Sequence, residues 1–178
     1  MVKAIQRKLF LVSLLILFLG SCKSSKRAVS KSSKSTSEEI ILTRDSTLKV
    51  NELANKVVDY AKQFNGVKYK YGGNTKRGMD CSGLISTSFG SEKILLPRTT
   101  SDLSKTGQWI DLKEVEKGDL LFFATKKNSR KVNHVAIVTE ARTGYVEFIH
   151  STTSAGVIVS NLEEKYWYFA FVQARRVF

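Results

Sequence analysis

The stretch "YKYGGNTKRGMDCSGLI", residues 69–85, joins a glycine-rich turn to the start of an apolar segment, with Cys81 at the junction. The glycines and the "NTKRG" run are typical of a turn, and "CSGLISTSF" predicts a helix that begins near Cys81. The chain of 178 residues has two cysteines, and the other is Cys22. Whether the Cys81 thiol has a partner therefore depends on what Cys22 does.

The first 21 residues have the layout of a secretory signal peptide. A basic start precedes an apolar run over residues 9–19 and then small residues, and the run is shorter than the roughly 20 residues that a helix needs to span a bilayer. Segment 1–21 is therefore expected to be removed. The closing "LGSC" resembles the lipobox of bacterial lipoproteins, so Cys22 is expected to carry acyl chains, such as palmitate, and to form no disulfide. The alternative is an ordinary secretory signal with a coincidental cysteine.

Residues 22–47 are predicted to be a lipidated cysteine followed by a disordered tether, because "KSSKRAVSKSSKSTS" is rich in serine and lysine and has almost nothing to bury. Lys23 stands where, by analogy with lipoproteins, an aspartate would favour retention in the inner membrane. The expected location is thus the cell envelope, with a lipid anchor in the outer membrane and the protein facing the periplasm.

The formal net charge of +13 does not indicate a nucleic-acid partner. Eight of the basic residues precede the first acidic residue, Glu38, and lie in the signal or the tether: Lys3, Arg7, Lys8, Lys23, Lys26, Arg27, Lys31 and Lys34. The rest of the chain is close to balanced, so no nucleic-acid binding is expected.

Residues 48–178 have the length of one domain. Apolar positions in "VNELANKVVDYAKQF" recur at helical spacing, and the second predicted helix begins at Cys81. Five later runs are short and rich in β-branched and aromatic residues, which predicts strands: "DLLFFAT", "NHVAIVTE", "YVEFIHST", "GVIVSNL" and "YFAFVQARRV". Helices followed by strands indicate an α+β fold, with N-terminal helices packed on an antiparallel sheet of about five to six strands.

The chain's two histidines, His134 and His150, lie in predicted strands. A cysteine at a helix start is favoured as thiolate by the helix dipole, and a nearby imidazolium favours it further. If the two strands are neighbours, one histidine can meet Cys81 and the other can orient the first, which is the nucleophile, base and orienter arrangement of acyl transfer.

Other interpretations of the same residues remain open. A lone buried cysteine is often a small core residue, and a strand histidine is often structural. Cys81, His134 and His150 could also be three zinc ligands, but no pair of them has the short spacing of a structural zinc site, so no metal is expected.

Five ordered blocks resemble the NlpC/P60 family of papain-like cysteine peptidases, in a lipoprotein form: "YKYGGNTKRGMDCSGLI", "LPRTT", "GDLLFF", "NHVAIVTE" and "FIHSTTSAGVIVS". The resemblance implies that Cys81 is the nucleophile, His134 the base and His150 the orienting residue. It also implies that Tyr69 lies at the active site, where its hydroxyl would assist the oxyanion.

The resemblance further implies that Asp80, Ser82 and Arg98 contact substrate. Structural roles are equally open for them: Asp80 and Ser82 are good helix caps, and Arg98 could be a surface charge that follows the turn at Pro97.

The expected activity is hydrolysis of an amide in peptidoglycan stem peptides, between γ-D-glutamate and the following diamino acid, in cell-wall remodelling or recycling. No cofactor is expected; the expected partners are peptidoglycan peptides and, through Cys22, a membrane, and the expected state is a monomer. The alternatives are a non-catalytic wall-binding or scaffold lipoprotein, and an amidase or acyltransferase of the same fold.

Overall fold

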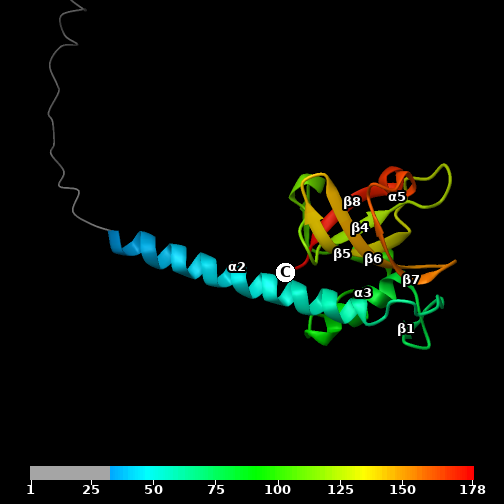
Figure 1. Ribbon diagram of the computed structural model, residues 1–178, viewed down its shortest axis with the longest axis horizontal. Coiled ribbons are helices and arrows are strands. Elements are labelled where there is room, and N and C mark those ends of the chain that lie inside the picture. Colours follow the sequence, from blue (N-terminus) through cyan, green and yellow to red (C-terminus); the bar gives the residue numbers. More distant parts are fainter. Residues whose placement is uncertain (1–32) are drawn as a thin grey trace, which may run out of the picture. The chain divides into compact units, whose positions relative to one another are not determined.

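The computed structural model describes residues 33–178, with side chains from residue 41 onward (Figure 1). The predicted signal peptide, Cys22 and the first part of the predicted tether lie outside these residues. The chain divides into two units, residues 1–39 and residues 40–178. Its described helices include none that is long and apolar enough to cross a membrane.

The helix α2 (Ser33–Lys62) begins earlier than the sequence indicates. The prediction of a disordered tether is therefore wrong over residues 33–47, where the structure has a helix. Residues 41–49 are exposed, so packing does not hold this part of the helix. Local pairs support it instead: Lys49 contacts Asp45 at 2.6 Å, four residues away, and such pairs stabilise helices without burial.

Six strands form one antiparallel sheet in the order β3-β8-β4-β5-β6-β7. Their bounds are β3 (Gln108–Ile110), β4 (Leu120–Phe123), β5 (His134–Arg142), β6 (Tyr145–Thr152), β7 (Gly156–Asn161) and β8 (Phe171–Arg176). The α+β prediction, with helices on an antiparallel sheet of five to six strands, is confirmed. The order follows from the chain, since β4 to β7 are joined by short connections and neighbour one another in sequence.

Two parts of the sheet differ from the sequence prediction. The edge strand β3 was not predicted, because three residues carry too little periodicity to be recognised. The last predicted strand, residues 168–177, is instead the end of helix α5 (Lys165–Ala170) followed by β8. The run "YWYFA" is rich in aromatic residues, which occur in helices as well as in strands, so its composition alone does not show that it is helical.

The sheet separates two apolar layers. Alternate residues of β4 point to opposite faces: Leu120 and Phe122 pack with α2 and α3 (Cys81–Ser91), whereas Leu121 and Phe123 pack with α5. Figure 1 shows α2 and α3 on one side of the sheet and α5 on the other. The remaining short elements are the hairpin β1 (Asn74–Thr75) and β2 (Gly78–Met79), the helix α4 (Thr100–Leu103) and the 3₁₀ turn η1 (Leu112–Glu114).

Candidate active site

Cys81 is the first residue of α3, and two neighbours fix the start of that helix. The Asp80 carboxylate accepts a hydrogen bond from the backbone N–H of Gly83 at 2.7 Å, which is a helix N-cap. Position 83 requires glycine, since a Cβ there would lie 2.1 Å from the carbonyl oxygen of Gly73. The glycine-rich turn therefore packs directly against the start of α3, and the Cys81 thiol lies where the two meet.

The Cys81 side chain is 9% exposed and lies between α3, α4 and β5. Its sulfur is 3.6 Å from the Thr100 hydroxyl oxygen, and the backbone N–H of Val135, the residue after His134, also stabilises the thiolate form. Among the hydrogen bonds of residues 40–178, none joins the sulfur to His134. The thiol thus lies beside the first residues of β5, with Thr100 as its hydrogen-bond partner.

The two histidines come together because β5 pairs with β6, so the condition stated from the sequence, that their strands are neighbours, is met. Nε2 of His134 is 2.8 Å from Nδ1 of His150, and Nε2 of His150 is 3.1 Å from the Ser160 hydroxyl oxygen in β7. Within the described residues, no hydrogen bond engages Nδ1 of His134. That nitrogen is consequently the one available for proton transfer.

Trp167 of α5 covers both imidazoles. Its ring lies 5.5 Å from the His134 ring, nearly parallel, and 4.5 Å from the His150 ring, edge to face. Trp167 is itself 8% exposed. The indole therefore shields the His134–His150 hydrogen bond from water, which strengthens that bond.

Burial favours the neutral forms of Cys81, His134 and His150. Desolvation lowers the pKa of His134 to about 4 and, together with the nearby His134 ring, that of His150 to about 3. Burial also raises the pKa of the Cys81 thiol, and the hydrogen bonds from Thr100 and from the Val135 and Ser82 N–H groups offset it only in part. The expected lowering of the thiol pKa is wrong for this structure, because the loss of water outweighs the hydrogen bonds that favour the thiolate.

Tyr69 lies in the same region as Cys81, near enough for the charge of the thiolate to act on its hydroxyl. A bridge pairs Tyr69 with Met79, and the N–H of Met79 donates to the Lys68 carbonyl, so the strand before the turn runs beside residues leading to Cys81. Burial and then the charges of Cys81 and Asp80 raise the pKa of the Tyr69 hydroxyl, which remains a neutral donor.

Asp80, Ser82 and Arg98 form one hydrogen-bonded cluster. The Arg98 guanidinium donates to both Asp80 carboxylate oxygens, at 2.8 and 3.0 Å, and to the Ser82 hydroxyl at 2.7 Å. The pKa of Asp80 is lowered because bonds from Arg98, Gly83 and Gly72 outweigh its desolvation. The capping role of Asp80 is thus present, and Arg98 is bound to Asp80 rather than being a free surface charge.

Three neighbours of these residues were missed at the sequence level: Thr100, Ser160 and Trp167. Thr100 and Ser160 lie inside the quoted blocks "LPRTT" and "FIHSTTSAGVIVS", but a hydroxyl residue there has no distinctive spacing. Trp167 lies immediately before the segment taken for a strand, residues 168–177. Within residues 40–178, no group of three or more His, Cys, Asp or Glu side chains is arranged to hold a metal ion.

Comparisons with known proteins all point to one family. The sequence model of the NlpC/P60 family matches residues 66–176. A probable endopeptidase NlpC homolog of Haemophilus influenzae is 42% identical over 113 residues, which cover 63% of this chain and 56% of that protein. The murein DD-endopeptidase MepS/murein LD-carboxypeptidase of Escherichia coli K12 is 35% identical over 127 residues, which cover 71% of this chain and 64% of that protein.

Solved structures agree with the sequence comparison. An NlpC/P60 family protein from Bacillus cereus superposes with a TM-score of 0.63 at 31% identity, over 69% of this chain and 39% of that one. The chain therefore matches only part of the length of these relatives, between about two fifths and two thirds.

Proposed function

Because this chain belongs to the NlpC/P60 family, we propose that residues 48–178 are a cysteine peptidase domain that hydrolyses amide bonds in peptidoglycan stem peptides. The observation that carries the proposal is the buried chain of hydrogen bonds from His134 through His150 to Ser160, together with a cysteine at a helix start that accepts from the backbone N–H of Val135, the residue after His134.

The reaction begins with neutral groups. As the Cys81 sulfur attacks the carbonyl carbon, its proton passes to Nδ1 of His134, and the carbonyl electrons move to oxygen. The low pKa of His134 makes the resulting imidazolium a strong acid. It protonates the amine nitrogen, the C–N bond breaks, and an acyl group remains on sulfur.

Water completes the cycle. His134, neutral again, takes a proton from water as the oxygen attacks the thioester, and returns that proton to sulfur when the acid product leaves. The backbone N–H of Cys81 and the hydroxyl of Tyr69 are the donors assigned to the developing oxyanion. The mechanism assigns one tautomer to each histidine: Nε2 of His134 donates to Nδ1 of His150 and Nε2 of His150 donates to Ser160, which leaves Nδ1 of His134 unprotonated; the distances of 2.8 and 3.1 Å fit this assignment.

The bond assigned is that between γ-D-glutamate and the following diamino acid. In this assignment the Asp80 carboxylate and the Ser82 hydroxyl contact the free amino end of the stem peptide, and Arg98 holds Asp80 in place. The cluster supports this because Asp80 remains ionised, and a carboxylate is suited to an ammonium group. The Escherichia coli relative is named a murein DD-endopeptidase and LD-carboxypeptidase, and these names describe other bonds for that protein.

The envelope location and the anchor are part of the same proposal. Segment 1–21 is the secretory signal, Cys22 carries the acyl chains, and a monomeric catalytic domain faces the periplasm from the outer membrane. Support comes from the sequence "LGSC" and from the wall-directed activity of the domain.

The test is digestion of purified peptidoglycan by the protein and by its Cys81→Ala variant, followed by identification of fragments by mass spectrometry. The expected products from the wild type are dipeptides ending in γ-D-glutamate, which stay on the glycan where the stem is attached to it, and released peptides that begin with the diamino acid. Cleavage between two D-residues would replace the bond assignment and keep the peptidase. Absence of fragments from both proteins would refute the enzyme, and a non-catalytic wall-binding protein would then be the better account.

A further inference from the structure

The helix α5 presents aromatic side chains to solvent on the side of the sheet opposite α3. Trp167 and Ala170 are buried, whereas Tyr166 and Tyr168 are each 59% exposed and Phe169 is 73% exposed. Among the described residues, the one ring that the Phe169 ring contacts is that of Tyr168, at 5.6 Å. Packing within the domain therefore explains the buried pair but not the three exposed rings, and such a patch indicates a contact with something else.

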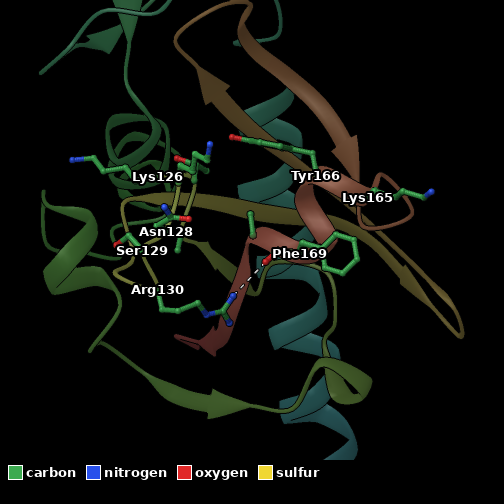
Figure 2. A pocket seen from close by; sticks show the side chains of 11 residues that line it. Lys126, Asn128, Ser129, Arg130, Lys165, Tyr166 and Phe169 are labelled. Carbon is green, nitrogen blue, oxygen red and sulfur yellow. Dashed lines mark hydrogen bonds between the residues drawn. The ribbon is translucent and has the colours of Figure 1, made fainter.

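Cationic side chains lie next to these rings. The loop that joins β4 to β5 and one side of α5 enclose an open hollow of about 650 Å³ (Figure 2). Eleven residues line it, including Tyr166 and Phe169, and none of the eleven is acidic. Four of them are exposed cations: Lys126, Lys127, Arg130 and Lys165. These four cations with Tyr166 and Phe169 are called the α5 face below.

Acidic residues do not neutralise the α5 face. Among residues 41–178, no ion pair engages any of its three lysines. Glu163 and Glu164 precede α5 in sequence, but Glu163 lines a second hollow on the other side of the helix. The Glu164 carboxylate accepts from the backbone N–H of Asn161 at 3.0 Å. The face therefore has an excess of positive charge, which is complementary to an anionic partner.

Arg130 joins the two parts of the α5 face. Its guanidinium donates to the backbone carbonyls of Phe169 and Phe171, at 3.3 and 3.2 Å. The dashed line in Figure 2 marks the bond to Phe169. The loop and the helix are thus linked, and their cations and aromatic rings can contact one surface together.

We propose that the α5 face docks on the surface of an anionic lipid bilayer. At such a surface aromatic rings enter the headgroup region, and lysine and arginine side chains lie against lipid phosphates. A small soluble anion would account for the cations but would leave the exposed Tyr166 and Phe169 rings without a role. The inference goes beyond the proposed peptidase activity and does not depend on it.

Docking through this face determines which side of the domain is directed away from the lipid. The helices α3 and α5 lie on opposite sides of the sheet (Figure 1). The docked domain therefore turns α3, which begins at Cys81, away from the bilayer. The contact is additional to the anchor proposed at Cys22, and an anchor that keeps the domain near a membrane allows even a weak contact to orient it.

The test uses the chain from residue 22 with Cys22→Ser, which carries no acyl chain, and measures its cosedimentation with vesicles. One set of vesicles is phosphatidylcholine alone, and the other also contains phosphatidylglycerol. We expect the partition coefficient to be at least about tenfold higher for the anionic vesicles. The combined variant Lys126→Gln, Lys127→Gln and Lys165→Gln should lose at least about tenfold of this binding, since each cation at the surface contributes up to about fivefold.

The aromatic part of the α5 face is tested by Phe169→Ser. This variant should bind the anionic vesicles about threefold more weakly, because part of the ring leaves water on docking. Binding equal to that of the unsubstituted face would refute docking through α5. Thermal unfolding shows that each variant keeps its fold, and no readout involves turnover, so an inactive peptidase leaves the test intact.

The matched control changes three lysines on α2, in the β1–β2 hairpin and after α3, as Lys62→Gln, Lys76→Gln and Lys93→Gln, with the same change in net charge. It should bind the anionic vesicles within about twofold of the parent chain, because distant charges are screened. The basic residues of the predicted tether are the same in every protein compared. Equal loss in the two lysine variants would show a general charge effect and overturn the proposal, as would equal binding of the parent chain to both kinds of vesicle. If the α5 variant instead lost binding to purified peptidoglycan and kept binding to vesicles, the face would belong to the wall polymer and the proposal would be wrong.

Discussion

At the scale of single residues, the charges of Cys81, His134 and His150 follow from burial. Each is removed from water, and each therefore has its neutral form favoured in the free protein. A neutral thiol beside a neutral imidazole means that proton transfer accompanies attack on the substrate rather than preceding it. The measurable consequence is the pH at which the thiol becomes reactive.

We expect the rate of Cys81 alkylation by iodoacetamide to rise with pH through a value above the 8.5 or so of a free thiol. The reason is that burial raises the pKa of the thiol. The rate is measured on the tryptic peptide that contains Cys81, which separates it from Cys22. Thr100→Val should shift the rise to still higher pH, because the Thr100 hydroxyl stabilises the thiolate. A rate already at its plateau below pH 7 would show instead a preformed thiolate.

Sequence reasoning identifies these reacting groups better than their surroundings. His134 and His150 could be placed together because consecutive strands usually pair, and β5 and β6 do. The charge of the groups could not be predicted, since it depends on Trp167, which reaches the imidazoles from an unrecognised helix. Local patterns show which residue types are present but not how completely water is excluded from them.

At the scale of elements, the start of α3 determines where the thiol lies. The carbonyl of Gly73 approaches position 83 so closely that the helix and the turn fit together only through a glycine. The "DCSG" sequence thus serves packing as well as chemistry: Asp80 caps the helix, and Gly83 admits the turn.

Gly83→Ala is expected to reduce the free energy of unfolding by about 2–4 kcal/mol, since the added methyl group overlaps backbone that cannot move without displacing the turn. Urea denaturation measures the change. Gly90→Ala is the matched control in the same helix, because a Cβ there meets nothing within 4 Å. It should be neutral or stabilising by up to about 1 kcal/mol. Equal effects of the two variants would contradict the close approach.

The helix α2 shows the limit of composition at this scale. Its buried positions Val57, Val58 and Ala61 were recognised from their spacing. The exposed turns before them were not, because serine and lysine residues give no periodic apolar signal, and local ion pairs such as Lys49–Asp45 are weak evidence in a sequence.

At the scale of the whole molecule, the two histidines lie within an apolar layer between the sheet and α5. Phe148 contacts the His150 ring at 5.1 Å, and Phe123 contacts the His134 ring at 6.1 Å. A charge introduced into this layer opposes the fold as a whole, so acid should weaken the entire domain.

We expect stability to fall as the pH is lowered from 6.5 toward 4. In this interval the unfolded chain binds protons at His134 and His150, whereas the folded chain, with pKa values of about 4 and 3, does not. Stability is fully present above pH 6.5, and His134 alone accounts for a loss of about 2 kcal/mol by pH 4.5. Urea unfolding at pH 7.5 and 4.5 measures the difference. The variant His134→Gln with His150→Gln should lose markedly less stability over the same interval, and a loss equal to that of the wild type would assign acid sensitivity to other groups.

The claim on which the function depends is that Cys81 attacks a stem-peptide amide. The most direct measurement is the rate at which the full protein and its Cys81→Ala variant release the diamino-acid fragment from a defined stem peptide, with thermal unfolding of both to show that the fold is retained. The account predicts measurable turnover by the wild type and a decrease of at least about 10³-fold in the variant, the scale expected when a nucleophile is removed. Release by an equally stable variant at more than a tenth of the wild-type rate would contradict it.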